Sequence, residues 1–183
     1  MVAGMTASPL EVGVLAPDFT LKDQNGVDVT LSSFRRSTGS RDGADGGSRA
    51  GKNVLLVFYP FAFSGICTGE LHEIRDDLGS FVGDDIQVLA ISCDPIFSLR
   101  GWADLEGYFF PLLSDFWPHG EVSRAYGVFH HPGGMPTRGT FLIDTEGVIR
   151  WSLINPPGEV RDFGAYRAAL ADLRARASGS LTA

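Results

Sequence analysis

Apolar positions along the chain fall into short runs that predict buried strands alternating with helices. Residues 54–59 and 86–92 are almost continuously apolar and have the length of strands, which is typical of strands covered on both faces. After the first run, Leu71, Ile74 and Leu78 recur at spacings of three and four and predict a helix with one face in the core. We therefore expect a βαβ unit in which the two strands are parallel.

An antiparallel hairpin is predicted near the N-terminus. Residues 19–21 and 27–31 alternate apolar and polar positions and flank Asn25-Gly26, a dipeptide that suits a type I′ turn. Farther on, a stretch of small and polar residues contains no large apolar side chain, so it cannot offset the entropy lost on ordering. The segments expected to be loose are this flexible insertion at 37–51 and the termini at 1–12 and 178–183.

The second half of the chain continues the alternation and ends in an antiparallel unit. The predicted elements, in order, are a helix capped by Ser98, a strand at 109–113, a weak helix at 121–126, a Gly/Pro-rich loop at 130–136, strands at 140–144 and 148–153, and a helix at 162–177. This order predicts an α/β, thioredoxin-like fold: a central mixed sheet flanked by helices, with the N-terminal hairpin added, in a single domain over residues 1–183. Element order alone also fits other α/β folds.

Composition and charge disfavour several classes of function. The net charge of −7 and the pI near 5.0 argue against non-specific binding to nucleic acid or anionic membrane. No apolar run reaches the roughly 20 residues needed to span a bilayer. The first 20 residues contain no Lys or Arg and no continuous apolar core, so a secretory signal is not expected. A cytoplasmic protein is therefore expected.

The two cysteines, Cys67 and Cys93, form neither a CxxC pair nor a zinc-ligand set. The histidines also lack the spacing of metal ligands, so no metal and no other cofactor is expected.

Cys67 is the candidate nucleophile because it stands where a buried strand turns into a helix. Unpaired N–H groups and the positive end of the helix dipole favour a thiolate there. A buried, inert thiol is the alternative, since free cysteines are often buried. The neighbours favour the nucleophile: Ser64 can hydrogen-bond the sulfur or an incoming oxygen, and Pro60 stiffens the entry to the turn.

The pattern Pro60-x-x-x-Ser64-x-x-Cys67 resembles the active-site signature of the peroxiredoxins. Further stretches look like landmarks of the same family and cover nearly the whole chain between residues 12 and 175, apart from the insertion. They are Ala16-Pro17-Asp18-Phe19, Ala90-Ile91-Ser92, Leu113-Ser114-Asp115, Ala125-Tyr126-Gly127-Val128 and Arg138-Gly139-Thr140-Phe141-Leu142-Ile143-Asp144. Within the family, residues 65–67, 115–120 and 157–162 are most similar to the AhpE-like one-cysteine group.

The resemblance implies a thiol-dependent peroxidase and gives four residues a catalytic role. Cys67 would be the peroxidatic cysteine, Pro60 would shield it, Ser64 would hydrogen-bond thiolate and peroxide, and Arg138 would fix both. An always-charged planar guanidinium suits this role. Without the resemblance, Arg138 is best interpreted as an ordinary surface arginine near a strand.

Two further residues are candidates for a supporting role. Glu70 would orient an arginine, or would simply be a favourable carboxylate in the first turn of a helix. Trp102 would pack beside the site, although a core aromatic is the simpler interpretation. At position 64 the family more often has Thr, so Ser keeps the hydroxyl and loses the methyl group that fixes the rotamer.

A one-cysteine mechanism is expected because Cys93, which follows a buried strand, is the only other thiol and is interpreted as structural. The substrates implied are hydrogen peroxide and organic hydroperoxides. A small thiol or a thioredoxin- or glutaredoxin-like partner would then reduce the sulfenic acid on Cys67. The resemblance also implies a homodimer, formed through the loops around Cys67 and residues 115–118.

Two other functions compete with the peroxidase. A thioredoxin-like disulfide oxidoreductase is disfavoured because Glu70 stands where the second cysteine of a CxxC motif would be. A redox sensor or holdase without enzymatic activity would bind a client protein in its oxidised form. Peroxide turnover with a thiol and no client distinguishes the peroxidase from both.

Overall fold

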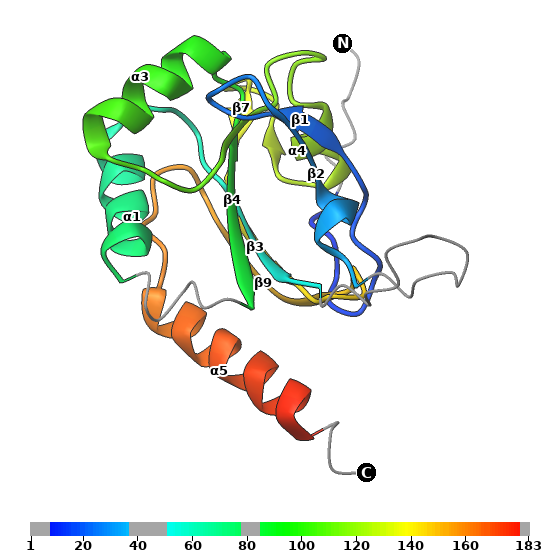
Figure 1. Ribbon diagram of the computed structural model, residues 1–183. Helices are drawn as coiled ribbons and strands as arrows, with labels where there is room; N and C mark the ends of the chain where they lie inside the picture. The colour runs from blue at the N-terminus through cyan, green and yellow to red at the C-terminus, as the bar shows by residue number, and fades with distance from the viewer. Residues whose placement is uncertain (1–7, 37–50, 78–84, 180–183) are drawn as a thin grey trace, which may run out of the picture.

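A seven-stranded mixed sheet forms the centre of the protein (Figure 1). The computed structural model describes residues 8–36, 51–77 and 85–179. In the order in which they lie across the sheet, the strands are β2 (Asp28–Thr30), β1 (Thr20–Lys22), β5 (Leu112–Ser114), β4 (Ile86–Ser92), β3 (Asn53–Phe58), β8 (Arg138–Ile143) and β9 (Ile149–Asn155). The strands β3, β4 and β5 run parallel, and the remaining pairings are antiparallel. The predicted thioredoxin-like fold with an N-terminal hairpin is confirmed.

Helices cover both faces of the sheet and enclose two apolar clusters. One face carries α1 (Gly65–Asp76), α3 (Ile96–Glu106) and α5 (Phe163–Gly179), and the other carries α4 (Glu121–Ala125) and the 3-10 helix η1 (Leu31–Phe34). Alternate residues of β3 enter the two clusters: Leu55 and Val57 face α1, whereas Leu56 and Phe58 face α4. The run at 54–59 is continuously apolar because the strand is buried on both sides.

Several element boundaries differ from the sequence-based predictions. The helix α3 begins at Ile96 after Pro95, whose backbone is extended, so Ser98 lies inside the first turn and does not cap it. The loop at 130–136 contains a small hairpin, in which β6 (Phe129–His130) pairs with β7 (Met135–Pro136). Gly134 makes this turn possible because it takes a positive φ of 63°.

The ends of the predicted insertion lie close together. Residues 37–50 fall outside the described residues, but the Lys52 amide donates to the Phe34 carbonyl at 2.8 Å. A Cβ on Gly51 would lie 2.4 Å from the backbone nitrogen of Arg36. The chain therefore leaves and re-enters the fold at adjacent points, and the flexibility of the insertion stays a prediction.

The two predicted loose termini lie partly outside the described residues. At the N-terminal end, the Leu10 amide donates to the Tyr126 carbonyl at 3.4 Å, so the described part of residues 8–12 contacts the fold. At the other end, α5 continues to Gly179. Within the described ranges, none of the helices is both long and apolar enough to cross a membrane.

Candidate active site

The first turn of α1 presents Cys67 at the carboxyl end of β3. Ser64 is the N-cap of this helix, and its Oγ accepts a hydrogen bond from the Cys67 amide at 3.4 Å. The helix therefore begins at Gly65, two residues earlier than the predicted start near Cys67. Phe63, just before the cap, has a left-handed φ of 62°, a strained conformation for a residue with a side chain. Pro60, the first residue after Tyr59 in this connection, is buried.

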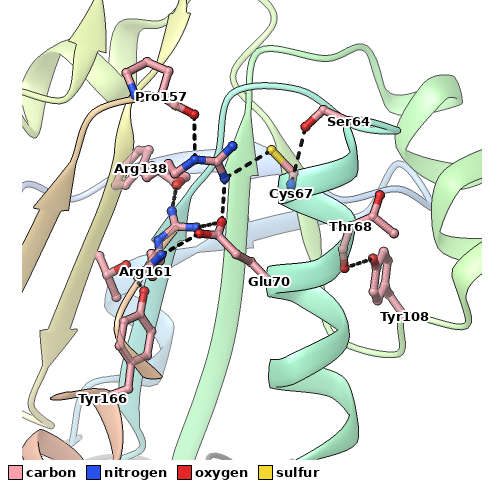
Figure 2. A network of polar contacts seen from close by, with 11 residues as sticks. Ser64, Cys67, Thr68, Glu70, Tyr108, Arg138, Pro157, Arg161 and Tyr166 are labelled. Carbon is pink, nitrogen blue, oxygen red and sulfur yellow. Dashed lines mark hydrogen bonds and ion pairs between the residues drawn. The ribbon is translucent and has the colours of Figure 1, made fainter. Parts of the chain in front are cut away.

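Arg138 is buried beside Cys67 and is not a surface arginine (Figure 2). Its Nη1 lies 3.5 Å from Cys67 Sγ, and its Nε donates to the Pro157 carbonyl at 2.8 Å. The sheet explains this placement: β8 pairs with β3 with Thr140 opposite Val57, so the first residue of β8 reaches the end of β3 where the chain turns toward α1. The geometry brings together the arginine and the cysteine that the resemblance paired.

Glu70 bridges two buried guanidinium groups. It lies one turn after Cys67, and its Oε2 accepts from Arg138 Nη1 at 2.5 Å. Its Oε1 accepts from the backbone amide of Arg161 at 2.9 Å, and Oε2 also pairs with the Arg161 side chain. The Arg161 guanidinium donates in addition to the Phe58 carbonyl, the last residue of β3. Glu70 therefore contacts an arginine, as the first of its two interpretations expected.

Arg161 is a residue of the site that the sequence analysis missed. It was noted only as part of the stretch 157–162, with no role of its own. A signal was present: a carboxylate one turn into a helix, on the helix face that carries Cys67, requires cations if it is buried, and a second arginine follows the last strand. Periodicity could not show that this carboxylate is buried.

The buried charged side chains beside Cys67 carry a net positive charge. Arg138 and Arg161 contribute two positive charges, and Glu70 contributes one negative charge. A thiolate on Cys67 supplies the second negative charge. The Arg138 guanidinium, 3.5 Å from Sγ, offsets part of the cost of burying a negative charge at this position.

Trp102 packs beneath the loop that carries the site. It is fully buried, and its ring lies 5.4 Å from that of Tyr59 and 6.1 Å from that of Phe63. Tyr108 packs against it edge-on at 5.0 Å and also donates its hydroxyl proton to the carbonyl of Thr68, the residue after Cys67. These aromatic contacts support the turn before α1, so Trp102 lies near the site as a packing residue.

Cys93 is buried at the end of the neighbouring strand in a different electrostatic environment. Burial, and then the negative charges of Asp115 and Asp94, raise the pKa of the Cys93 thiol to about 12. Asp94 also accepts a hydrogen bond from the Ala62 amide at 2.8 Å, which ties this strand end to the loop before Cys67. Both cysteines are free thiols. In the part of the chain that the structure describes, no three His, Cys, Asp or Glu side chains are grouped as metal ligands.

Comparison with known proteins places these features in one family. Residues 43–152 match the AhpC/TSA family. The chain is 51% identical over 166 residues to alkyl hydroperoxide reductase E of Mycobacterium tuberculosis (strain ATCC 25618 / H37Rv). This match covers 91% of this chain and 99% of the relative. It is 30% identical over 154 residues to a peroxiredoxin of Thermoplasma volcanium, with 81% of this chain and 67% of the relative covered.

Solved structures give the same result. The crystal structure of peroxidoxin BcpB from Mycobacterium tuberculosis matches with a TM-score of 0.71 and 30% identity, over 91% of this chain and 97% of that one. The reduced 2-Cys peroxiredoxin of Plasmodium vivax matches in fold with a TM-score of 0.75 at 23% identity, over 93% and 85% of the two chains. The chain therefore belongs to the AhpC/TSA family and is a peroxiredoxin, a thiol-dependent peroxidase.

Proposed function

We propose that this chain reduces hydrogen peroxide and organic hydroperoxides by a one-cysteine mechanism in which Cys67 is the nucleophile. The observation that carries the proposal is the contact of 3.5 Å between Arg138 Nη1 and Cys67 Sγ inside a buried network of charges. A cation at this position favours the thiolate, and the thiolate is the reactive form of cysteine.

The first half of the cycle breaks the O–O bond of the peroxide. The Cys67 thiolate attacks one peroxide oxygen, an S–O bond forms, and the second oxygen leaves as water or an alcohol after taking up a proton. Arg138 is placed to stabilise the charge that develops on the departing oxygen. Figure 2 shows the guanidinium of Arg138 between Cys67, Glu70 and Pro157, beside the sulfur that would react with the peroxide. The Ser64 hydroxyl is a further hydrogen-bonding group at the same turn.

The second half of the cycle requires thiols from outside the chain. The first thiol attacks the sulfenic acid on Cys67, water leaves, and a mixed disulfide forms; a second thiol then releases the Cys67 thiolate. We assign no resolving role to Cys93, because it is buried and the neighbouring carboxylates Asp115 and Asp94 disfavour its thiolate. We assign the reductant to a small thiol or to a thioredoxin- or glutaredoxin-like protein, and we place the enzyme in the cytoplasm as a single domain.

A homodimer is part of the proposal. The segment after β5 exposes Phe116 and Trp117, with 81% of the Trp117 surface accessible to solvent. Phe61 and Phe63, in the loop before Cys67, are also exposed. Exposed aromatic residues in such numbers are typical of protein interfaces. A strictly monomeric sedimentation profile at micromolar concentration would contradict this assembly.

The direct test is peroxide consumption by purified protein with a thiol as the only reductant. We expect repeated turnover without any client protein present. A stoichiometric reaction that stops after one peroxide per chain, whichever thiol is supplied, would favour the redox sensor over the peroxidase.

A further inference from the structure

A buried tyrosine of the C-terminal helix lies against the charge network of the site. Tyr166 of α5 is fully buried, and its ring packs against Trp151 of β9 and Phe163, with ring centroids 5.3 Å and 5.1 Å away. Its hydroxyl hydrogen-bonds the hydroxyl of Thr140, which lies on β8 two residues after Arg138. Both the ring and the hydroxyl are therefore held in place.

The Tyr166 hydroxyl lies beside Arg161, as Figure 2 shows. Burial raises the pKa of Tyr166, while the positive charge of Arg161 and its hydrogen bond to the hydroxyl act in the opposite direction. When the Tyr166 hydroxyl donates its hydrogen bond to Thr140, the tyrosine oxygen can accept a hydrogen bond from the Arg161 guanidinium. The Nε–H of Arg161 is buried without a hydrogen bond among the described residues, so each polar neighbour of this side chain matters for its position.

A continuous series of polar contacts runs from Tyr166 to the sulfur. Arg161 contacts both oxygens of Glu70, through its backbone amide and through its side chain. Glu70 contacts Arg138 at 2.5 Å, and Arg138 lies 3.5 Å from Cys67 Sγ. Every member of the series is buried, where a displaced charge is costly.

We propose that Tyr166 is a positioning residue for the peroxidase reaction: its hydroxyl holds Arg161, and Arg161 holds Glu70 and thereby Arg138 against the Cys67 thiolate. The inference rests on the proposed function of Cys67. Tyr166 does not touch the peroxide and acts only through the two arginines. Since Tyr166 belongs to α5, this role makes the C-terminal helix a part of the active site.

The test is Tyr166→Phe, which keeps the ring and its packing and removes only the hydroxyl. Two quantities are measured on the full chain: the ultraviolet absorbance of the Cys67 thiolate as a function of pH, and the second-order rate constant for hydrogen peroxide. We expect a rate about tenfold lower at neutral pH and a thiolate that forms only at higher pH, because a hydrogen bond to a charged group is lost. Thr140→Val removes the hydrogen-bond partner of the Tyr166 hydroxyl and should act in the same direction with a smaller effect. If Tyr166→Phe does not fold, Thr140→Val serves as the test of the positioning role.

Leu170→Ala is the matched control, because it removes a buried side chain of the same helix without touching a polar group. It should lower Tm and leave the pH midpoint of the thiolate unchanged. The positioning role is wrong if Tyr166→Phe and Thr140→Val both leave the rate constant within twofold of the parent and the pH midpoint of the thiolate unchanged. It is also wrong if Leu170→Ala moves the pH midpoint as far as Tyr166→Phe does. A parent protein that does not react with peroxide would instead refute the proposed function.

Discussion

The two cysteines of this chain lie near the carboxyl ends of adjacent parallel strands, and both are buried. The charged groups nearest to them have opposite signs. Cys67, with no exposed surface, has the Arg138 guanidinium at 3.5 Å and lies in the first turn of a helix. Cys93, with 7% of its surface exposed, lies among the carboxylates Asp94 and Asp115. Burial disfavours the charged form of either thiol, whereas the nearest charges act in opposite directions: the guanidinium beside Cys67 favours a thiolate, and the carboxylates beside Cys93 disfavour one.

The largest expected effect comes from exchanging the two thiols for hydroxyls. Cys67→Ser should abolish peroxidase activity, with a loss of at least about 10³-fold, since a serine hydroxyl is not ionised at neutral pH and is a much weaker nucleophile than a thiolate. Cys93→Ser is the matched control and should retain the activity of the parent within about twofold. Steady-state consumption of hydrogen peroxide with a thiol measures both. Equal losses in the two variants would mean that the thiols act together.

The next largest effect is expected from changing the cation beside Cys67. Arg138→Lys keeps a positive charge but loses the planar fork that reaches Cys67, Glu70 and the Pro157 carbonyl at once. We expect a peroxide rate constant about 10²-fold lower, which corresponds to roughly 2.7 kcal/mol of transition-state stabilisation. Circular dichroism should show an intact fold. A variant that folds and reacts as fast as the parent would show that Arg138 has no role in the chemistry.

A smaller effect is expected from Cys93 on the pH dependence of the free energy of unfolding. Its folded-state pKa of about 12 lies above the unfolded value, roughly 8.5, so the unfolded chain loses this proton first as pH rises and the folded state loses stability. Between pH 7 and pH 9.5 this amounts to about 1.4 kcal/mol. The free energy of unfolding of the parent should therefore fall more steeply than that of Cys93→Ser, in which all other groups are shared. Parallel curves for the two proteins would show that Cys93 ionises as easily folded as unfolded.

The smallest effect is expected from the insertion, which lies away from both thiols in sequence. Deleting residues 39–50 should change activity by less than about twofold and Tm by less than about 2 °C, since the Phe34 carbonyl and the Lys52 amide are already paired across its base. A Gly/Ser replacement of equal length separates the effect of length from that of sequence. A large loss of activity with the deletion alone would indicate that the insertion reaches the site or a partner.

The sequence predicted the fold well where a single period governs a segment. The run at 54–59 identified a strand covered on both faces, and the spacing of Leu71 and Ile74 identified the helix beneath Cys67. It failed at the start of α3, because Pro95 fixed the backbone one turn earlier than a serine cap would have done. Local turn chemistry decides such boundaries, and it competes with periodicity over only a few residues.

The site was predictable only in its local part. Ser64 and Cys67 are three residues apart, so one turn of helix brings them together. Arg138 and Arg161 are brought to the sulfur and to Glu70 by strand pairing and by the loop before α5, which no spacing along the chain reveals. The resemblance supplied Arg138, whereas Arg161 emerged only from the packing.

The central claim is that Cys67 alone is oxidised and that an external thiol completes the cycle. Intact mass and peptide mapping after one equivalent of hydrogen peroxide, with and without a sulfenic acid trap, test it most directly. We predict a trapped sulfenic acid on Cys67, an unmodified Cys93, and the same result in Cys93→Ser. A disulfide between Cys67 and Cys93, together with turnover that stalls in Cys93→Ser, would contradict the account.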